Sequence, residues 1–576
     1  MRGLRAGTPT KAAFLLMSET ASTAVAATDH ELREGIDDGV GLREALARLP
    51  RDARLLDTAK CRLAADEAAI RRTFEADGRA ATVAFKRSLV IDQLIQGLWD
   101  WAEHRRYPLP NPTPAERIAV VAVGGYGRGE LAPHSDIDLL FLHAYKPTSR
   151  IEQLVETVLY TLWDLRLKVG HAVRSTEDAL RAAKRDTTIL TADLETRLVA
   201  GDAALYEDFK RRLRSEVVAG RGPGYLEEKL VERTARHAKV GDSRYLLEPN
   251  VKEGEGGLRD LHLVMWLARF FHDAQQPDDL VAHRMLDRTE LRTFRRAEQF
   301  LWAVRCHLHY LTGRPEERLT FDLQTEVAQR MGFRARDRLA SVERFMKRFY
   351  MVAKDVGTLT STVTATLSAE HRRRPLVALS AFGFRRVRID GFVIADGRID
   401  LEDKSLFHRE PGAILRLFEL ADERGVEIRP QALRAAIREL RRVNAEVRDA
   451  PATIARIVHA ITAAEHPAEL LSRLNDIGAL GRFVPEFGRV VALMQHNLYH
   501  SFTVDEHTLK VIGELDAISR GEPAQELPLA TEVVQHIVSR PELYLAAFFH
   551  DLGKGRKGNH SAVGEQIAQT VLTRWG

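Results

Sequence analysis

The chain has 576 residues, too many for one hydrophobic core, so two to four domains are expected. Its 85 basic and 81 acidic residues leave a net charge of +4, too balanced to indicate a nucleic-acid-binding protein by composition. The two cysteines, Cys61 and Cys306, have neither disulfide-framework nor zinc-site spacing, which favours a reducing compartment.

The first 30 residues predict a disordered leader, because their apolar run, AAFLLM, is shorter than the core of most secretory signals. No later stretch reaches the roughly 18 uncharged apolar residues of a membrane span. We therefore expect a soluble, cytoplasmic protein that contacts no membrane.

Helical spacing of apolar residues extends from residue 31 to 104 and ends at a proline-rich break, YPLPNPTPAE. Next, IAVVAVGGYGRGELAPHSDIDLLFLHAY predicts a strand, a glycine-rich connection and a second strand. An amphipathic helix, IEQLVETVLYTLWDLRLKVG, and a short strand, HAVRS, are predicted to follow. Residues 179–369 are predicted to be helical, with one interruption at EPNVKEGEGGLRDLH.

Beyond residue 370 the composition changes, and alternating apolar residues around Asp396-Gly397 predict a hairpin with a type I′ turn. From Pro411 onward the pattern is helical again. The expected fold class is α+β and predominantly helical, with a small mixed sheet in the first half. The expected segments are a leader at 1–30, a catalytic head with a helical region at 31–365, a linker and helical domain with a hairpin at 366–480, and an all-α domain at 481–576.

Two aspartates, Asp136 and Asp138, begin the second apolar run in the segment Ser-Asp-Ile-Asp. Alternate residues of a strand point to the same side, so both carboxylates are predicted to project together with Ile137 buried behind them. Oxygen ligands suit Mg²⁺, which assists phosphoryl transfer by stabilising the attacking and leaving oxygens. Asp136 and Asp138 are therefore predicted to be catalytic metal ligands.

Four residues near this pair are predicted to bind a nucleotide. At Gly124 and Gly125 the missing Cβ lets backbone N–H groups approach a phosphate, and Ser135 adds a hydroxyl donor. Arg128 offers a guanidinium to the same phosphates, although a structural role fits its position equally well. An ordinary turn would explain Gly124 and Gly125 alone, and a solvated strand end would explain the two aspartates alone. The nine residues between Gly125 and Ser135 and the flanking strands favour a nucleotide site.

The segment GGYGRGELAPHSDIDLLF resembles the signature of the polymerase-β-like nucleotidyltransferases. WDLRLKVGHAVR, LEPNVKEGEGGLRDLH, RCHLHYLTGRPEERLTFDLQ and VERFMKRFY resemble, in order, segments of the bifunctional uridylyltransferase/uridylyl-removing enzymes of the nitrogen regulatory protein PII. The resemblance covers most of residues 60–576. It implies transfer of UMP from UTP to a tyrosine of PII, with Mg²⁺ or Mn²⁺ as cofactor and no nucleic-acid partner.

The same resemblance implies a third carboxylate, but the predicted strand HAVRS has no acidic residue. Asp193 and Glu195 are the candidates, and an exposed helix face explains them equally well. In the glycine-rich interruption, Lys252, Arg259 and Asp260 fit either a nucleotide- or protein-contacting loop or a turn that starts a helix. For His307, His309 and Arg314, core or capping roles on a helix are favoured over metal binding.

A second site is predicted near the end of the chain. His507 lies early in a predicted helix, and His550-Asp551 ends a strongly apolar one, where two adjacent polar groups are costly to bury unless they are paired or bind a metal. The pattern resembles that of HD-domain metal-dependent phosphohydrolases, with Lys554 as catalytic support. This resemblance implies that His507, His550 and Asp551 bind a metal such as Mn²⁺, Zn²⁺, Fe or Mg²⁺ and hydrolyse uridylyl-tyrosine.

Other histidines near this second site are weaker candidates. His560 is interpreted as a supporting or loop residue, and His496 and His500 as structural or substrate-side residues. The sequence ends at LTRWG, before the positions where the resemblance would place a distal aspartate and tandem glutamine-sensing domains. The HD domain is therefore expected to be incomplete.

Three further functions are alternatives to PII uridylylation. A CCA-adding tRNA nucleotidyltransferase also couples such a head to an HD domain, but it requires a basic RNA-binding surface. A regulatory binding protein with inactive sites conflicts with the intact Asp136 and Asp138 pair. A (p)ppGpp synthetase/hydrolase is disfavoured because that family places its HD domain first.

Overall fold

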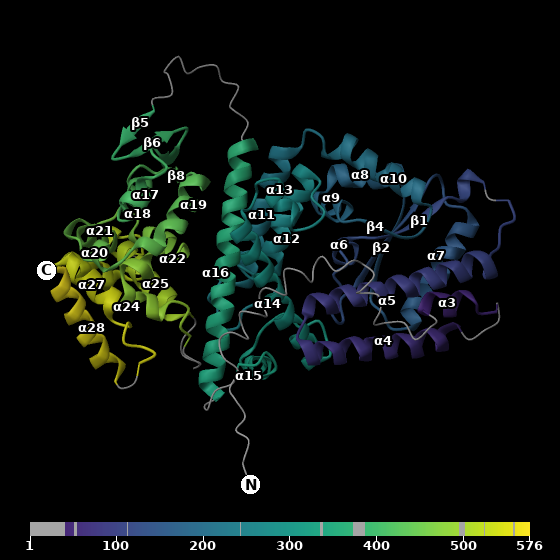
Figure 1. Cartoon of the computed structure of the whole chain (residues 1–576), viewed down its shortest axis with the longest axis horizontal. Coiled ribbons are helices and arrows are strands. Elements are labelled where there is room, and N and C mark those ends of the chain that lie inside the picture. The colour runs from purple at the N-terminus through teal and green to yellow at the C-terminus, as the bar shows by residue number, and fades with distance from the viewer. Residues whose placement is uncertain are drawn as a thin grey trace, which may run out of the picture. The chain divides into compact units, whose positions relative to one another are not determined.

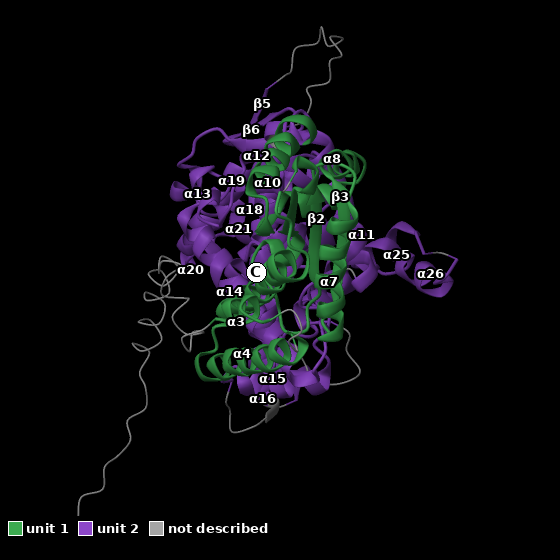
Figure 2. Ribbon diagram, turned by 90° about the vertical axis from the view of Figure 1, so that its right-hand side faces the viewer, with its two compact units in different colours: residues 1–217 green, residues 218–576 purple. Residues whose placement is uncertain are grey.

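The structure is a computed structural model that describes residues 41–50, 55–111, 113–241, 243–333, 338–371, 386–494, 502–523, 525–556 and 559–576. Within these ranges the chain is mostly helical and contains two four-stranded sheets (Figure 1). It divides into two compact units, residues 1–217 and 218–576 (Figure 2). The predicted fold class is confirmed. The predicted leader lies outside the described residues, and the predicted segment boundaries stay predictions.

Unit 1 begins with helices that precede its sheet: α3 (Leu42–Ala47), α4 (Leu55–Asp77) and α5 (Ala80–Trp101). Helix α5 is buried along most of its length and packs against α3 and α4. A π-helical turn (Ala102–Arg106) and a short 3-10 turn (Pro114–Glu116) then lead into the first strand. The predicted break of the helical pattern at the proline-rich segment is confirmed.

The sheet of unit 1 has the order β3-β2-β1-β4. Strand β1 (Ile118–Ala122) is antiparallel to β2 (Ile137–His143), and between them lies the short helix α6 (Gly124–Gly127). Helix α7 (Ser149–Asp164) buries one apolar stripe and connects β2 to the parallel strand β3 (Val169–Ser175). The predicted succession of strand, glycine-rich connection, strand, amphipathic helix and short strand is therefore confirmed.

Strand β4 (Arg197–Gly201) corrects the prediction of continuous helix from residue 179. It pairs antiparallel with β1, and its last residue, Gly201, has a φ of 84°. A Cβ at Gly201 would lie 2.3 Å from the carbonyl oxygen of Ile118, so the backbone approach requires glycine. A run of five residues is too short for periodicity to reveal, and pairing with the distant β1 decides its conformation. The surrounding helices are α8 (Thr176–Arg185), α9 (Thr187–Leu194) and α10 (Ala203–Arg212), followed by a π-helical turn (Leu213–Val218).

The first part of unit 2 consists of four helices packed around the long helix α16 (Arg338–His371) and a short helix beside them. The four are α11 (Gly222–Val240), α12 (Leu258–His272), α14 (Arg288–Thr312) and α15 (Phe321–Arg330), and the short helix α13 (Asp279–Ala282) packs against α14. The predicted interruption of the helical pattern falls between α11 and α12.

A second sheet follows, with the order β5-β6-β7-β8: β5 (Val387–Ile389), β6 (Phe392–Ala395), β7 (Arg398–Leu401) and β8 (Glu427–Ile428). Asp396 and Gly397, between β6 and β7, have φ values of 55° and 71°. Both values are positive, as a type I′ turn requires, so the predicted hairpin is confirmed. A second Asp-Gly pair, at 390 and 391, makes an equivalent turn that the prediction missed.

The remaining described residues are helical apart from β8, as predicted. The helices are α17 (Leu406–Arg409), α18 (Ala413–Glu423), α19 (Pro430–Glu439), α20 (Ala445–Arg448), α21 (Pro451–Thr462), α22 (Pro467–Asp476), α23 (Ala479–Phe483), α24 (Pro485–Val490), α25 (Val504–Arg520), α26 (Pro528–Gln535), α27 (Arg540–Phe549) and α28 (His560–Trp575), with a 3-10 turn at Leu440–Arg442. Among the helices within the described ranges, none is both long enough and apolar enough to cross a bilayer.

Candidate functional site

The turn after β1 lies directly against the second predicted aspartate. Gly124 starts α6 with a φ of 58°, a conformation that favours glycine. A Cβ at this position would lie 3.7 Å from Oδ2 of Asp138, and the Val123 N–H donates to the Asp138 carbonyl at 3.0 Å. Antiparallel pairing of β1 with β2 therefore brings Gly124, a predicted phosphate-binding glycine, next to a predicted metal ligand.

Gly170 on β3 approaches the same carboxylate from the other side. It is paired with Asp138 in the parallel register, and a Cβ on Gly170 would lie only 2.4 Å from Asp138 Oδ1. A glycine at this position therefore leaves the space that the carboxylate occupies. Gly170 has no local signal in the sequence, because the constraint on it comes from a neighbouring strand.

The burial pattern of Asp136, Ile137 and Asp138 follows strand alternation. Asp136 is exposed, Ile137 is 2% exposed and Asp138 is half-buried. Strand geometry places the two aspartates on the side opposite Ile137, with Ser135 half-buried just before them. Asp136 and Asp138 lie at the N-terminal end of β2, and the Asp138 carboxylate is set between Gly124 and Gly170. Carboxylate oxygens are the hard ligands that Mg²⁺ prefers.

Arg128 is paired with two carboxylates. Its side chain is 8% exposed and donates to Glu130 at 2.7 Å and to Glu195 at 2.5 Å. Burial opposes the charged form, but Glu130 and Glu195 hold the pKa of Arg128 above its usual value. These two ion pairs favour the structural alternative for Arg128, because a phosphate would have to displace them to reach it. Nucleotide binding by Arg128 stays a prediction.

The two candidates for a third carboxylate differ. Glu195 is buried and bonded to Arg128, which accounts for its charge. Asp193, in α9, is 4% exposed, and burial raises its pKa to about 7, against the opposing charge of Arg174. Helix α9 packs against α6. Asp193 is therefore the better candidate of the two, and the alternative of an exposed helix face is wrong for both.

Asp193 makes stability depend on pH. Because the folded protein binds this proton more tightly than the unfolded chain, Asp193 favours the unfolded state increasingly as pH rises from the ordinary pKa of 3.8 to about 7. We expect Asp193→Asn to gain more than about 1 kcal/mol of stability relative to the parent between pH 5 and pH 8, since one pKa unit is worth about 1.4 kcal/mol. Urea midpoints of both proteins at each pH measure this difference. The exposed Asp164→Asn serves as control, and an equal gain in the control would contradict the assignment.

A buried network that the sequence did not reveal holds α6 in place. The Tyr126 hydroxyl donates to Asp92 at 2.6 Å, and Arg197 donates to both oxygens of Asp92 at 2.7 and 3.0 Å. Asp92 lies on α5 and Arg197 on β4, so side chains more than 70 residues apart fix the turn that carries Gly124 and Gly125. Such a network depends on the tertiary fold and leaves no local sequence pattern.

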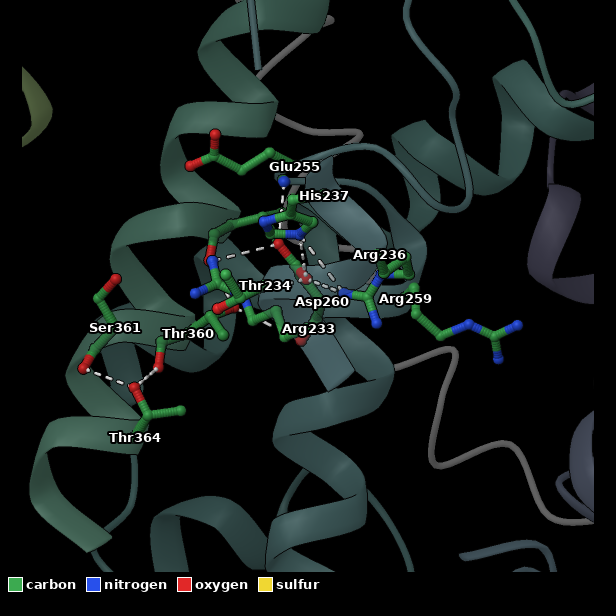
Figure 3. A network of polar contacts seen from close by, with 12 residues as sticks. Arg233, Thr234, Arg236, His237, Glu255, Arg259, Asp260, Thr360, Ser361 and Thr364 are labelled. Carbon is green, nitrogen blue, oxygen red and sulfur yellow. Dashed lines mark hydrogen bonds and ion pairs between the residues drawn. The ribbon is translucent and has the colours of Figure 1, made fainter. Parts of the chain in front are cut away.

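The first turn of α12, directly after the glycine-rich segment, carries a buried carboxylate, that of Asp260 (Figure 3). Asp260 is 0% exposed and accepts from Arg236 at 2.6 Å, His237 at 3.2 Å, Arg233 at 3.3 Å and the Gly256 N–H at 3.0 Å. Burial would raise its pKa, but the hydrogen bond from His237 and the charges of Arg233 and Arg236 hold the pKa well below its usual range. The structure therefore favours the structural alternative for Asp260, in which the segment forms a turn that starts a helix.

The other residues predicted around this segment are also paired. Arg259 donates to Glu253 at 2.9 Å and lies over the Trp266 ring, and the Lys252 ammonium is 3.8 Å from Glu253. Burial, helped by Arg305 and Arg259, lowers the pKa of Lys252.

The candidates on α14 and in the loop after it have structural partners. His307 and His309 are buried in α14, and His309 lies 3.5 Å from Glu317. Arg314 is exposed and pairs with Glu316 at 2.6 Å. The predicted core role is confirmed for the two histidines, whereas Arg314 lies beyond the end of the helix.

Replacing Asp260 with alanine is expected to lower the free energy of unfolding by about 3 to 5 kcal/mol, because it leaves two arginines and a histidine without their shared anion. Urea denaturation measures the loss. Asp278, in the same unit, is half-exposed and pairs with the surface residue Arg295, so Asp278→Ala should cost at most about 1 kcal/mol. Similar losses for both variants would refute the role of Asp260 as a scaffold centre.

The second predicted site is assembled from two helices. His507 lies in α25, and His550 and Asp551 follow α27. Asp551 Oδ2 is 3.2 Å from His550 Nε2 and 3.7 Å from His507 Nε2, and one ligand atom from each residue lies within 4.8 Å of the other two. Among the described residues this is the only group of at least three histidine, cysteine, aspartate or glutamate side chains so arranged. The predicted grouping of these three residues is therefore confirmed.

Lys554 completes the group, with its ammonium 2.8 Å from Asp551 Oδ2. Burial would raise the pKa of Asp551, but His550 and Lys554 hold that pKa well below its usual range. In return, the hydrogen bond with Asp551 raises the pKa of His550. Two imidazoles and an ionised carboxylate are a donor set that first-row divalent ions accept, so these residues fit a metal.

The backbone after Asp551 is packed closely against the start of α28. A Cβ on Gly553 would lie 2.1 Å from the carbonyl oxygen of His560, so only glycine fits there. The His560 side chain is exposed and lies outside the group of His507, His550 and Asp551. His560 is the first residue of α28 and not a loop residue, and a supporting role for it stays a prediction. His496 and His500 lie outside the described residues.

Comparison with known families identifies three segments of the chain. Residues 112–187 match the family described as a nucleotidyltransferase domain, and residues 224–364 match the family described as GlnD PII-uridylyltransferase. Residues 392–483 match the family described as the uridylyltransferase GlnD third domain. The first match contains Asp136 and Asp138, and the second contains the Asp260 network.

Curated relatives are similar over most of the chain. The bifunctional uridylyltransferase/uridylyl-removing enzyme of Azospirillum brasilense is 47% identical over 512 residues, which are 88% of this chain and 55% of the relative. Enzymes of the same name from Rhodospirillum rubrum and Novosphingobium aromaticivorans are each 44% identical, over 91% and 94% of this chain and 56% and 58% of the relative. The chain thus spans a little more than half the length of these relatives. Over the residues compared, it belongs to the family of bifunctional uridylyltransferase/uridylyl-removing enzymes.

Proposed function

We propose that the chain transfers UMP from UTP to a tyrosine hydroxyl of a PII signal-transduction protein. The observation that carries the proposal is the position of Asp138 between Gly124 and Gly170, beside Asp136, within the segment that matches nucleotidyltransferase domains. The match of residues 224–364 to PII-uridylyltransferases supports this function over CCA addition to tRNA. The net charge of +4 also gives no support to an RNA substrate.

In this proposal Asp136 and Asp138 would hold Mg²⁺, which supplies charge neutralisation of the triphosphate. Backbone N–H groups at Gly124 and Gly125 and the hydroxyl of Ser135 bind the phosphates and orient the α-phosphorus. The tyrosine oxygen forms the new bond to that phosphorus as pyrophosphate leaves and the hydroxyl proton is lost. Arg128 contributes by fixing the turn through Glu130 and Glu195.

We also propose that the group of His507, His550 and Asp551 belongs to a hydrolase site that removes UMP from the modified tyrosine. A divalent ion bound there supplies Lewis acidity for cleavage of a phosphodiester. Lys554 holds the Asp551 carboxylate in place through its contact at 2.8 Å. The name of the curated relatives joins the two opposed activities and supports this pairing.

The transfer proposal is tested by incubating the chain with a PII protein, Mg²⁺ and labelled UTP or ATP, and in parallel with tRNA. Label from UTP is expected on the PII protein, and Asp136→Asn is expected to abolish it. Transfer from ATP alone, or label on tRNA, would overturn the proposal. Release of UMP from modified PII, lost in His507→Ala, tests the hydrolase proposal separately.

A further inference from the structure

The first turn of α25, which carries His507, is attached to its surroundings by the buried carboxylate of Asp505. Asp505 is 0% exposed. Its Oδ1 accepts from the Ala492 N–H at 3.1 Å, and its Oδ2 accepts from the Asn475 side-chain amide at 3.2 Å. A buried carboxylate is costly to leave unbonded, so these two hydrogen bonds fix its position.

Asn475 connects this carboxylate to a buried cation. Its side-chain oxygen accepts from the ammonium of Lys354 at 3.3 Å, and Lys354 is 5% exposed. Lys354 lies in α16 and Asn475 in α22, so the chain of contacts joins residues of the two matched GlnD-family segments to α25. The amide has one orientation that serves both neighbours, its N–H₂ toward Asp505 and its oxygen toward Lys354.

A backbone contact at the same place attaches the start of α25 to the segment before it. The Val504 N–H donates to the Leu493 carbonyl at 3.0 Å. Ala492, which donates to Asp505, has a φ of 56°, an unfavourable conformation for a residue with a Cβ. The surroundings therefore maintain a strained residue whose N–H points at the Asp505 carboxylate.

We infer that Asp505, held by Asn475 and Lys354, is a positioning residue that sets His507 for divalent-metal binding with His550 and Asp551. The inference rests on the proposed hydrolase site. His507 is two residues from Asp505 in the same helical turn, so a shift of that turn moves its imidazole relative to Asp551, 3.7 Å away. Groups that orient metal ligands typically change metal affinity by about 10- to 100-fold when altered.

The directional chain predicts what an amide at position 505 would do. In Asp505→Asn, one side-chain atom can still accept from Ala492, but its N–H₂ then faces the N–H₂ of Asn475. Rotation of the Asn475 amide relieves that clash only by turning its N–H₂ toward the Lys354 ammonium. In the double variant Asp505→Asn/Lys354→Met the ammonium is gone, so the amide can rotate and part of the geometry returns.

The same helix provides a matched control. Asp516 is also a buried carboxylate of α25, 8% exposed, and pairs with Arg520 at 2.6 Å and Arg540 at 3.0 Å. It lies more than two helical turns beyond His507. Asp516→Asn therefore perturbs α25 comparably without touching the turn that carries His507.

The test is a Co²⁺ titration of the full chain, followed by the visible absorption of the bound ion, with thermal unfolding recorded for every variant. Asp505→Asn is expected to weaken Co²⁺ binding by about 10- to 100-fold and to alter the absorption bands. Asp516→Asn should bind like the parent even where it is less stable. The double variant should bind more tightly than Asp505→Asn, so the two substitutions are not additive.

Unchanged Co²⁺ binding in Asp505→Asn, or equal weakening in Asp516→Asn, overturns the inference. Should Asp505→Asn fail to fold, Lys354→Met alone decides, because it frees the Asn475 amide and is expected to weaken binding in the same direction. A parent chain that binds no Co²⁺ refutes the proposed metal site itself, and the inference with it. A parent that binds while the 505 and 354 variants match it refutes only the positioning role.

Discussion

Replacing Asp138 with asparagine is expected to lower the rate of UMP transfer by about 100- to 1,000-fold. Charge stabilisation by a bound ion is worth several kcal/mol in the transition state, and each 1.4 kcal/mol corresponds to about tenfold in rate. Asparagine keeps the shape of the side chain, which is half-buried, so the fold should persist. Transfer of label from UTP to a PII protein at saturating Mg²⁺ measures the effect, and circular dichroism checks the fold.

Gly170→Ala is a second test of the Asp138 carboxylate, because it displaces the carboxylate without replacing it. The added methyl group would lie 2.4 Å from Asp138 Oδ1, so the carboxylate must move, and a displacement of about 1 Å in a site can cost about 100-fold in rate. Asp164→Asn, at the exposed end of α7, is the control and should be fully active. Full activity in both Asp138→Asn and Gly170→Ala would show that this carboxylate takes no part in the reaction.

Loss of divalent-metal binding is the expected result of His550→Ala, by at least about 100-fold in affinity. The side chain contributes one of three candidate ligand atoms that lie within 4.8 Å of one another, and without it only those of His507 and Asp551 remain from this group. Isothermal titration with Mn²⁺ or Co²⁺ measures binding directly, and release of UMP from modified PII should fall in parallel.

A matched variant at His560 distinguishes loss of metal binding from a general disturbance of the domain. His560 is exposed and outside the group, so His560→Ala should bind metal like the parent. Because the Asp138 site lies in the other compact unit, UMP transfer by His550→Ala should also persist. Metal binding that survives in His550→Ala, or that falls equally in His560→Ala, would contradict the assignment.

Much of this architecture follows from local sequence. The β-branched run before Gly124, the Ser-Asp-Ile-Asp segment and the Asp396-Gly397 turn each have a conformation that their own residues dictate. The chemistry expected of His550-Asp551 is also local, because two adjacent polar groups beside an apolar helix are costly to bury unless they are paired or bind a metal. Their grouping with His507, which is distant in sequence, is what the resemblance to HD-domain phosphohydrolases implies.

Other features depend on contacts that no local pattern contains. Strand β4 exists because it pairs with β1, and Gly170 is constrained by a carboxylate on the next strand. Arg128 had the chemistry of a phosphate ligand, but Glu195, 67 residues away in sequence, pairs with it. The network of Asp92, Tyr126 and Arg197 is similar, since its members come from α5, α6 and β4. Tertiary pairing decides the role of each of these residues.

The carboxylate of Asp260 also limits local unfolding of the glycine-rich segment before α12. Residues 250–257 have the composition of a loop, yet the Gly256 N–H is bonded to Asp260, and the Asn250 side chain accepts from the N–H groups of Lys252 and Glu253. Local unfolding of this segment would break the anchoring of a carboxylate that two arginines and a histidine share. Its amide protons should therefore exchange with solvent almost as slowly as those of the adjoining helices, which makes the segment part of the rigid framework.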